Sequence, residues 1–176
     1  MSRIEPLLEQ VVAGLSHRRA NVRCWSTAGW KQEAEEWARR WPQLGPLGHW
    51  RGYTVPGPRP SVNLSPSICT ELIKLADRPQ PVWEDEWPDA LAWSAAMLAH
   101  EAQHVSGIRD EVRAECYGMQ SIQAAAVALG RTPQEGQYLA ALYWKRSYPR
   151  EGPVYRSRDC RNGGALDLRP DAGVWP

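Results

Sequence analysis

Apolar residues recur at intervals of three and four over most of this chain, and they alternate with polar residues only in short stretches. The first pattern is typical of an amphipathic helix, and the second of a half-buried strand. Helices are therefore expected at residues 5–17, 28–41, 66–77, 89–106, 110–129 and 132–146, and short strands at 21–26, 49–55 and 61–64. Because helices predominate, we predict an α+β domain in which helices pack on a small sheet of few strands.

Local signals mark where several of these elements begin and end. Ser65 and Pro66 are of the types favoured at a helix N-cap and at the first helical position. Thr132 and Glu135 have the spacing of a capping box at the start of the last helix. Gly107 interrupts the longest helical pattern. The two helices on either side of this glycine are therefore expected to form an αα-hairpin.

The chain has 176 residues, of which 43% are hydrophobic, and this is enough to bury a single core. One domain is therefore expected over residues 1–176. Gly, Pro, Asn and Asp are frequent near the C-terminus, which predicts turns there. We divide the domain into N-terminal helices (1–41), short strands (42–64), a helical part (65–146) and an irregular C-terminal tail (147–176).

The charge balance argues against two classes of partner. Twenty-one Lys and Arg residues stand against twenty Asp and Glu, so the net charge is +1. No overall field would draw such a chain to nucleic acid or to an acidic membrane. No apolar run has the length of a membrane span, and Glu5 and Glu9 interrupt the region where a signal peptide needs apolar residues. A cytoplasmic location is expected.

Four cysteines, Cys24, Cys69, Cys116 and Cys160, lie far apart and form no CxxC pair. This spacing argues against a zinc knuckle and against a thioredoxin-like site. Buried free thiols are expected, and two disulfides are the alternative in an oxidising compartment.

The segment HEAQH, residues 100–104, carries the main chemical signal of the chain. Positions i and i+4 of a helix lie on one face, so the imidazoles of His100 and His104 can bind one ion. Glu101 is rotated by roughly 100° and can reach a water on that ion without displacing a ligand. The ion would lower the pKa of the water, and Glu101 would take its proton.

This segment resembles the HExxH motif of the zincin metallopeptidases, and the resemblance extends over the following turn and helix. It implies a small zincin-like fold and Zn²⁺ held by His100 and His104, with Glu101 as the general base. It further implies a zinc metalloprotease, which is a hydrolase of peptide bonds in peptide or protein substrates.

Three acidic residues compete to be the third metal ligand. The stretch HExxHxxGxxD resembles the metzincin type and names Asp110. The alternative, a gluzincin-like pattern, names Glu111 as the ligand and Glu115 as the residue that orients His100. If Gly107 is the bend of a hairpin, His104 faces Glu111, His100 faces Glu115 and Gly118 faces Met97. This geometry favours Glu111, whereas Asp110 also fits a helix N-cap.

A zincin-like peptidase also needs a strand to hold its substrate and a group to stabilise the oxyanion. Residues 61–64 are the candidate edge strand beside the metal, with 49–55 as their neighbour. The oxyanion donor stays open among five aromatic residues, Tyr117, Tyr143, Tyr148, His49 and Tyr53. The alternative function is a catalytically inactive zincin-like domain that binds zinc structurally or serves as a protein-interaction module. A third hypothesis is a helical binding module without metal.

Overall fold

A four-stranded mixed sheet lies at one side of the molecule, in a computed structural model that describes residues 1–40 and 51–176. The strands are β1 (Ser2–Ile4), β2 (Asn21–Trp25), β3 (Gly52–Val55) and β4 (Ser61–Leu64), in the order β1-β2-β4-β3. β2 and β4 are parallel, whereas β1 and β3 run antiparallel to their neighbours. β4 therefore lies inside the sheet, and the prediction that residues 61–64 form an edge was wrong because β2 pairs with their other side.

The helices agree with the hydrophobic pattern to within a residue or two. They are α1 (Pro6–Ser16), α2 (Thr27–Arg40), α3 (Pro66–Asp77), α4 (Pro88–Ser106), α5 (Glu111–Ala128) and α6 (Pro133–Arg146). The capping box at Thr132 is formed, with both reciprocal hydrogen bonds to Glu135 present. β1 was not predicted, because three residues, two of them exposed, carry no periodic signal. Residues 49 and 50 of the third predicted strand lie outside the described residues.

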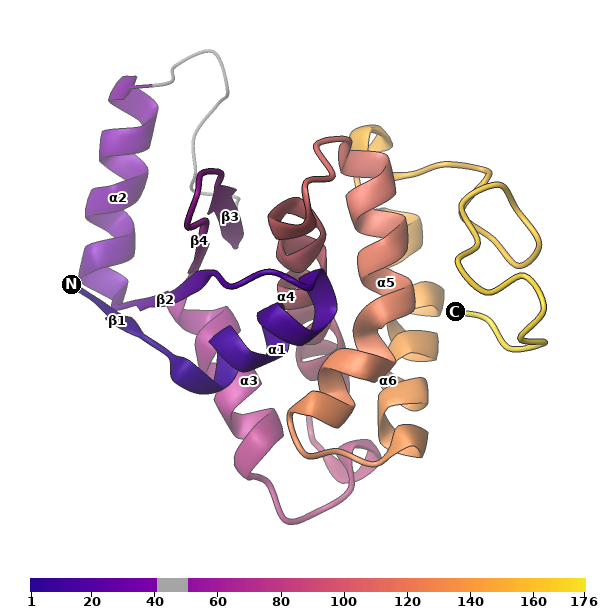
Figure 1. Cartoon of the computed structure of the whole chain (residues 1–176). Coiled ribbons are helices and arrows are strands. Elements are labelled where there is room, and N and C mark those ends of the chain that lie inside the picture. Colours follow the sequence, from indigo (N-terminus) through magenta and orange to yellow (C-terminus); the bar gives the residue numbers. More distant parts are fainter. Residues whose placement is uncertain (41–50) are drawn as a thin grey trace.

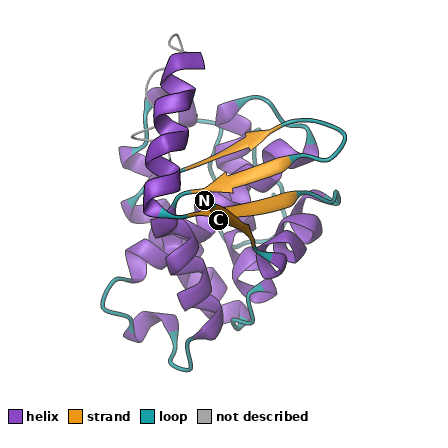
Figure 2. Cartoon of the chain, turned by 90° about the vertical axis from the view of Figure 1, so that its left-hand side faces the viewer, coloured by secondary structure: helices purple, strands orange, loops and turns teal. Residues whose placement is uncertain are grey.

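The helices cover the two faces of the sheet unequally (Figure 1). On one face, the Tyr53 ring packs against Trp30 and Trp37 of α2, with ring centroids 6.1 and 5.1 Å away. The other face buries Val22 and Leu64 against α1, α3 and α4. Figure 2 shows α2 on the near side of the sheet and the larger group of helices behind it. This arrangement agrees with the predicted α+β class. None of the helices in the described ranges combines the length and apolar character that a membrane span requires.

α4 and α5 form the predicted αα-hairpin. Gly107 ends α4 with φ of 109°, a left-handed conformation that glycine adopts without strain. Asp110 is the N-cap of α5, and its carboxylate accepts a hydrogen bond from the backbone N–H of Arg113. Gly118 lies against the backbone of His100, where an added Cβ would come within 2.8 Å. Its predicted position opposite Met97 was wrong by about one helical turn, and the glycine instead lets α5 approach His100 itself.

Two disulfides join segments that are distant in the sequence. Cys24 of β2 pairs with Cys69 of α3, and Cys116 of α5 pairs with Cys160 of the tail. The expectation of free thiols was therefore wrong. The pairs are 45 and 44 residues apart, and such separations leave no local spacing motif to recognise.

The tail is held against α5 although it has little regular structure. It contains two short 3₁₀ helices, η4 (Tyr148–Arg150) and η5 (Pro153–Tyr155), and a third, η3 (Val82–Glu84), precedes α4. The side chain of Gln120 donates to the carbonyl of Leu166 and accepts from the backbone N–H of Leu168, both at 2.8 Å. These bonds and the Cys116–Cys160 disulfide position the segment that carries η5.

Removing the tail disulfide with Cys116→Ala/Cys160→Ala is expected to lower the free energy of unfolding by about 3 to 4 kcal/mol, because an open chain has more conformational entropy. Urea unfolding measures this loss. The matched control is Cys24→Ala/Cys69→Ala, which opens a loop of similar length. Limited proteolysis within residues 147–176 should increase only in the first variant, and equal cleavage in both would contradict the anchoring role of the tail disulfide.

Candidate metal centre

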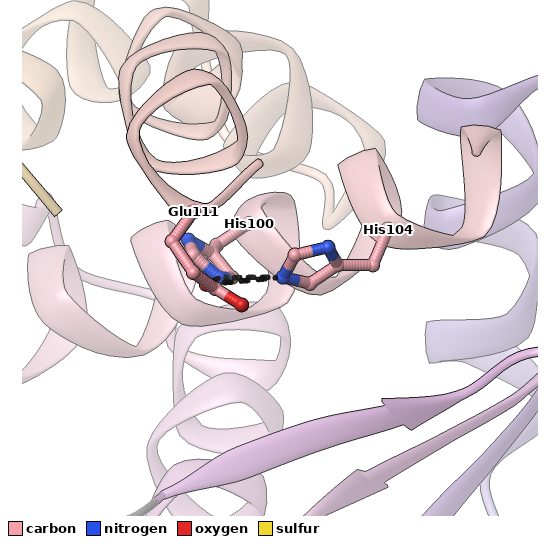
Figure 3. A group of neighbouring side chains, drawn as sticks. All are labelled: His100, His104 and Glu111. Atoms are coloured by element: carbon pink, nitrogen blue, oxygen red, sulfur yellow. Dashed lines mark hydrogen bonds and ion pairs between the residues drawn. The ribbon is translucent and has the colours of Figure 1, made fainter. Parts of the chain in front are cut away.

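His100, His104 and Glu111 point toward one another at the bend of the α4–α5 hairpin (Figure 3). The two Nε2 atoms are 3.0 Å apart, and Glu111 Oε2 lies 3.2 Å from that of His100 and 3.4 Å from that of His104. Ligands about 2.05 Å from a tetrahedral zinc ion are about 3.3 Å from one another. The three atoms therefore have the spacing of three corners of a zinc coordination sphere.

The second ring nitrogen of each histidine is already engaged. His100 Nδ1 lies 2.8 Å from Glu115 Oε2, and His104 Nδ1 lies 2.7 Å from the carbonyl oxygen of Ile108. A carboxylate and a carbonyl only accept hydrogen bonds, so both Nδ1 atoms carry the proton. When His100 loses its second proton, the lone pairs of both Nε2 atoms face the common point, which is the arrangement that metal-binding histidines usually have.

The structure separates the three acidic candidates. Glu111, at the first position of α5, is the only one of them that reaches both Nε2 atoms. Asp110 caps the helix, and Glu115 lies on the opposite side of the His100 ring. Glu115 also accepts a hydrogen bond of 2.5 Å from Tyr143, which fixes its carboxylate. This is the arrangement of the gluzincin-like alternative.

Charge in this cluster favours a cation. Burial lowers the pKa of His100, but hydrogen bonds with Glu111 and Glu115 outweigh it and raise the pKa to about 10. Burial raises the pKa of Glu111, but the two histidines outweigh it and lower the pKa to about 2. The same carboxylates that retain a proton on His100 would favour a divalent ion between the rings.

Glu101 lies beside this cluster and is buried, with 3% of its surface exposed. Its Oε2 accepts a hydrogen bond of 2.7 Å from the hydroxyl of Thr54 on β3. A Cβ at Gly52 would lie 3.3 Å from Oε1, so β3 leaves little free space around the carboxylate. Burial raises the pKa of Glu101, and the charges of His100 and His104 oppose this rise.

A cavity of about 830 Å³ opens over these residues, between β3, α4, the start of α5 and the tail. Tyr155 of η5 lines it, with its ring centroid 6.1 Å from that of His100. Burial and the nearby charge of Glu111 raise the pKa of Tyr155, so its hydroxyl keeps its proton. Glu151 lines the same wall and contacts the hydroxyl of Tyr143 at 3.3 Å.

Sequence reasoning missed Thr54, Glu151 and Tyr155 as parts of this site. Thr54 sits in an ordinary strand pattern, and the other two lie in the segment predicted to be irregular, so no periodicity marked them. Of the aromatic oxyanion candidates, Tyr143 and Tyr53 donate instead to Glu115 and Glu33. The others do not line the cavity or, for His49, lie outside the described residues.

Comparison with known proteins adds no relative: no protein-family model, no curated protein and no solved structure matches this chain.

Proposed function

We propose that this protein is a zinc-dependent metallopeptidase that hydrolyses peptide bonds, with His100, His104 and Glu111 as zinc ligands and Glu101 as general base. One observation carries the proposal: three ligand atoms have tetrahedral spacing while both Nδ1 atoms are held by acceptors. Among the described residues, only His100, His104 and Glu111 bring their ligand atoms together at the proposed zinc position. A structural zinc site has four protein ligands, whereas a catalytic one has three and keeps a position for water.

The residues around the ligands have separate roles in this proposal. A zinc ion held by the three ligands would act as a Lewis acid toward water and toward the substrate carbonyl. Glu101 takes the proton from the attacking water and delivers it to the leaving amine. Thr54 holds the Glu101 carboxylate in place, and Glu115, fixed by Tyr143, orients His100.

A peptide substrate is supported by the position of β3. This strand pairs with β4 on one side, and no strand in the described ranges pairs with the other. Its residues Gly52 and Thr54 line the cavity beside Glu101. An extended peptide can add to such an edge through main-chain hydrogen bonds, which would hold its scissile bond over the metal.

The two disulfides bear on where the protein works. Structural disulfides persist in oxidising compartments and are rare in the cytosol. We therefore propose an oxidising compartment in place of the cytoplasmic location that the sequence favoured.

Tyr155 is the proposed oxyanion donor, because it lines the cavity with its ring centroid 6.1 Å from that of His100 and its hydroxyl keeps its proton. Tyr155→Phe is expected to lower kcat by about 100-fold, as removal of one oxyanion donor does. Zinc content and KM should stay nearly constant, since the ring is retained. Steady-state kinetics of peptide hydrolysis measure the effect, and Tyr138→Phe, outside the cavity, is the control. An unchanged kcat would exclude Tyr155 from this role.

The alternative, an inactive zincin-like domain that binds zinc structurally or serves as an interaction module, keeps the same ligands but gives Glu101 no chemical task. The test of the proposal is therefore peptide hydrolysis by the zinc-loaded protein, compared with its Glu101→Gln variant.

A further inference from the structure

The cavity over the metal centre has a marked separation of charge between its floor and its rim. Its four acidic residues all bond to neighbours around the metal centre: Glu101 to Thr54, Glu111 to the two histidines, Glu115 to His100 and Tyr143, and Glu151 to Tyr143. Each of the four carboxylates in the cavity is therefore already bonded to another residue of the candidate site.

Apart from the two histidines, the positive groups that line the cavity are three exposed arginines, Arg18, Arg51 and Arg109. None of them has a carboxylate within ion-pair distance in the part of the chain that the structure describes. Arg18 donates to the carbonyl oxygens of Val105 and Gly57, and Arg51 lies over the ring of Trp93 at 5.8 Å. These contacts hold two guanidinium groups in place but leave their charge without a counter-ion.

The arginines stand at the two ends of the cavity. Trp93, beneath Arg51, and Val105, which accepts from Arg18, are twelve residues apart on α4. Twelve helical residues span about 18 Å, and an extended peptide covers that length in about five residues. Arg109 follows Ile108, whose carbonyl oxygen holds His104, so it lies at the Val105 end. A substrate paired with β3 would pass between positive charges on both sides of its scissile bond.

We infer that the cavity takes acidic peptides, with Asp or Glu within about three residues on either side of the scissile bond, and that Arg51 and Arg109 set this preference. The inference rests on the proposed peptidase function and names its substrate class. Unpaired guanidinium groups at a cavity mouth attract carboxylates at long range and accept them in bidentate geometry. The effect acts mainly on the association rate and is screened by salt.

The test uses the full-length, zinc-loaded protein and matched peptides that carry Glu, Gln or Lys on both sides of the cut. At low ionic strength kcat/KM for the Glu peptides is expected to exceed that for the Gln peptides by about tenfold. This ratio should fall toward unity in Arg51→Gln/Arg109→Gln and in about 1 M salt, where the Debye length is about 3 Å. Arg18 is left intact because it also joins α4 to the segment around Gly57.

Arg113→Gln is the matched control, because this arginine is exposed on α5 but does not line the cavity. It should keep the full preference for Glu peptides. Equal cleavage of Glu and Gln peptides, a preference for Lys peptides, or an unchanged ratio in the double variant would overturn the inference while leaving the peptidase function in place.

A measurement of peptide binding distinguishes failure of this inference from failure of the proposed peptidase function. Fluorescence anisotropy with labelled Glu and Gln peptides is measured on the same zinc-loaded protein and on the double variant. If nothing is cleaved but the Glu peptide binds better and the double variant loses the difference, the acidic preference stands and the catalytic proposal fails. If neither cleavage nor binding favours Glu, the acidic preference is overturned.

Discussion

Replacing Glu101 with glutamine is expected to lower kcat for peptide hydrolysis by about three orders of magnitude, the scale of general-base catalysis by a positioned group. Glutamine has nearly the same shape, and its side-chain oxygen can still accept the hydrogen bond from Thr54. It cannot take a proton from water. The zinc content should stay unchanged, because Glu101 is not one of the three proposed zinc ligands.

The stability of Glu101→Gln gives this experiment an internal control. Folding raises the pKa of Glu101, so above the ordinary pKa of the carboxyl its ionisation favours the unfolded chain. Glutamine removes this cost, so the melting temperature at neutral pH should equal or exceed that of the parent protein. A folded variant with zinc bound and turnover intact would exclude Glu101 as the base. Loss of turnover together with unfolding would not fit this account of the buried carboxylate.

Replacing His104 with alanine is expected to reduce the zinc content after dialysis from about one ion per chain to nearly none, because two ligands do not complete a tetrahedral site. Metal analysis of the purified protein measures this loss. Zinc at about 1,000 times its dissociation constant should stabilise the parent by about 4 kcal/mol. That corresponds to about 10 °C in melting temperature for a chain of this size. The variant should show no such shift.

One control and two further variants test whether the effect belongs to the candidate metal centre. His17→Asn changes an exposed histidine at the end of α1, where φ is 55°, a backbone conformation that asparagine tolerates. It should bind zinc like the parent. Glu111→Gln should lose zinc, whereas Asp110→Ala should keep it and lose about 1 kcal/mol of stability through the missing cap. Zinc retained in Glu111→Gln and lost in Asp110→Ala would favour the metzincin-like ligand set.

The agreement between sequence and structure is strongest where a pattern depends on neighbours within one or two helical turns. The helices follow from apolar spacing, and the capping box at Thr132 is formed as predicted. The three proposed zinc ligands are also close to one another in the sequence. His100 and His104 share a helix face, and Gly107 reverses the chain so that Glu111 returns to both rings. Even the error at Gly118 is one of register within a correctly predicted hairpin.

The other mistaken and missed features involve partners that are distant in the sequence. Residues 61–64 have the composition of a strand, but whether a strand is an edge depends on which other strands pair with it. Nothing in the sequence around Cys116 indicates that it pairs with Cys160, which lies 44 residues away. Thr54 and Tyr155 reach the site only because β3 lies along α4 and the tail is tied to α5.

The amino-acid pattern alone was therefore enough to define the hairpin that carries the candidate metal ligands, since helical periodicity and one glycine bring its residues together over a dozen positions. The pairing of the cysteines, the open edge of β3, the proposed oxyanion donor and the arginines at the cavity rim depended on long-range packing. The physical reason is that backbone geometry couples residues a few positions apart, whereas contacts between remote segments are selected by the burial of the whole core.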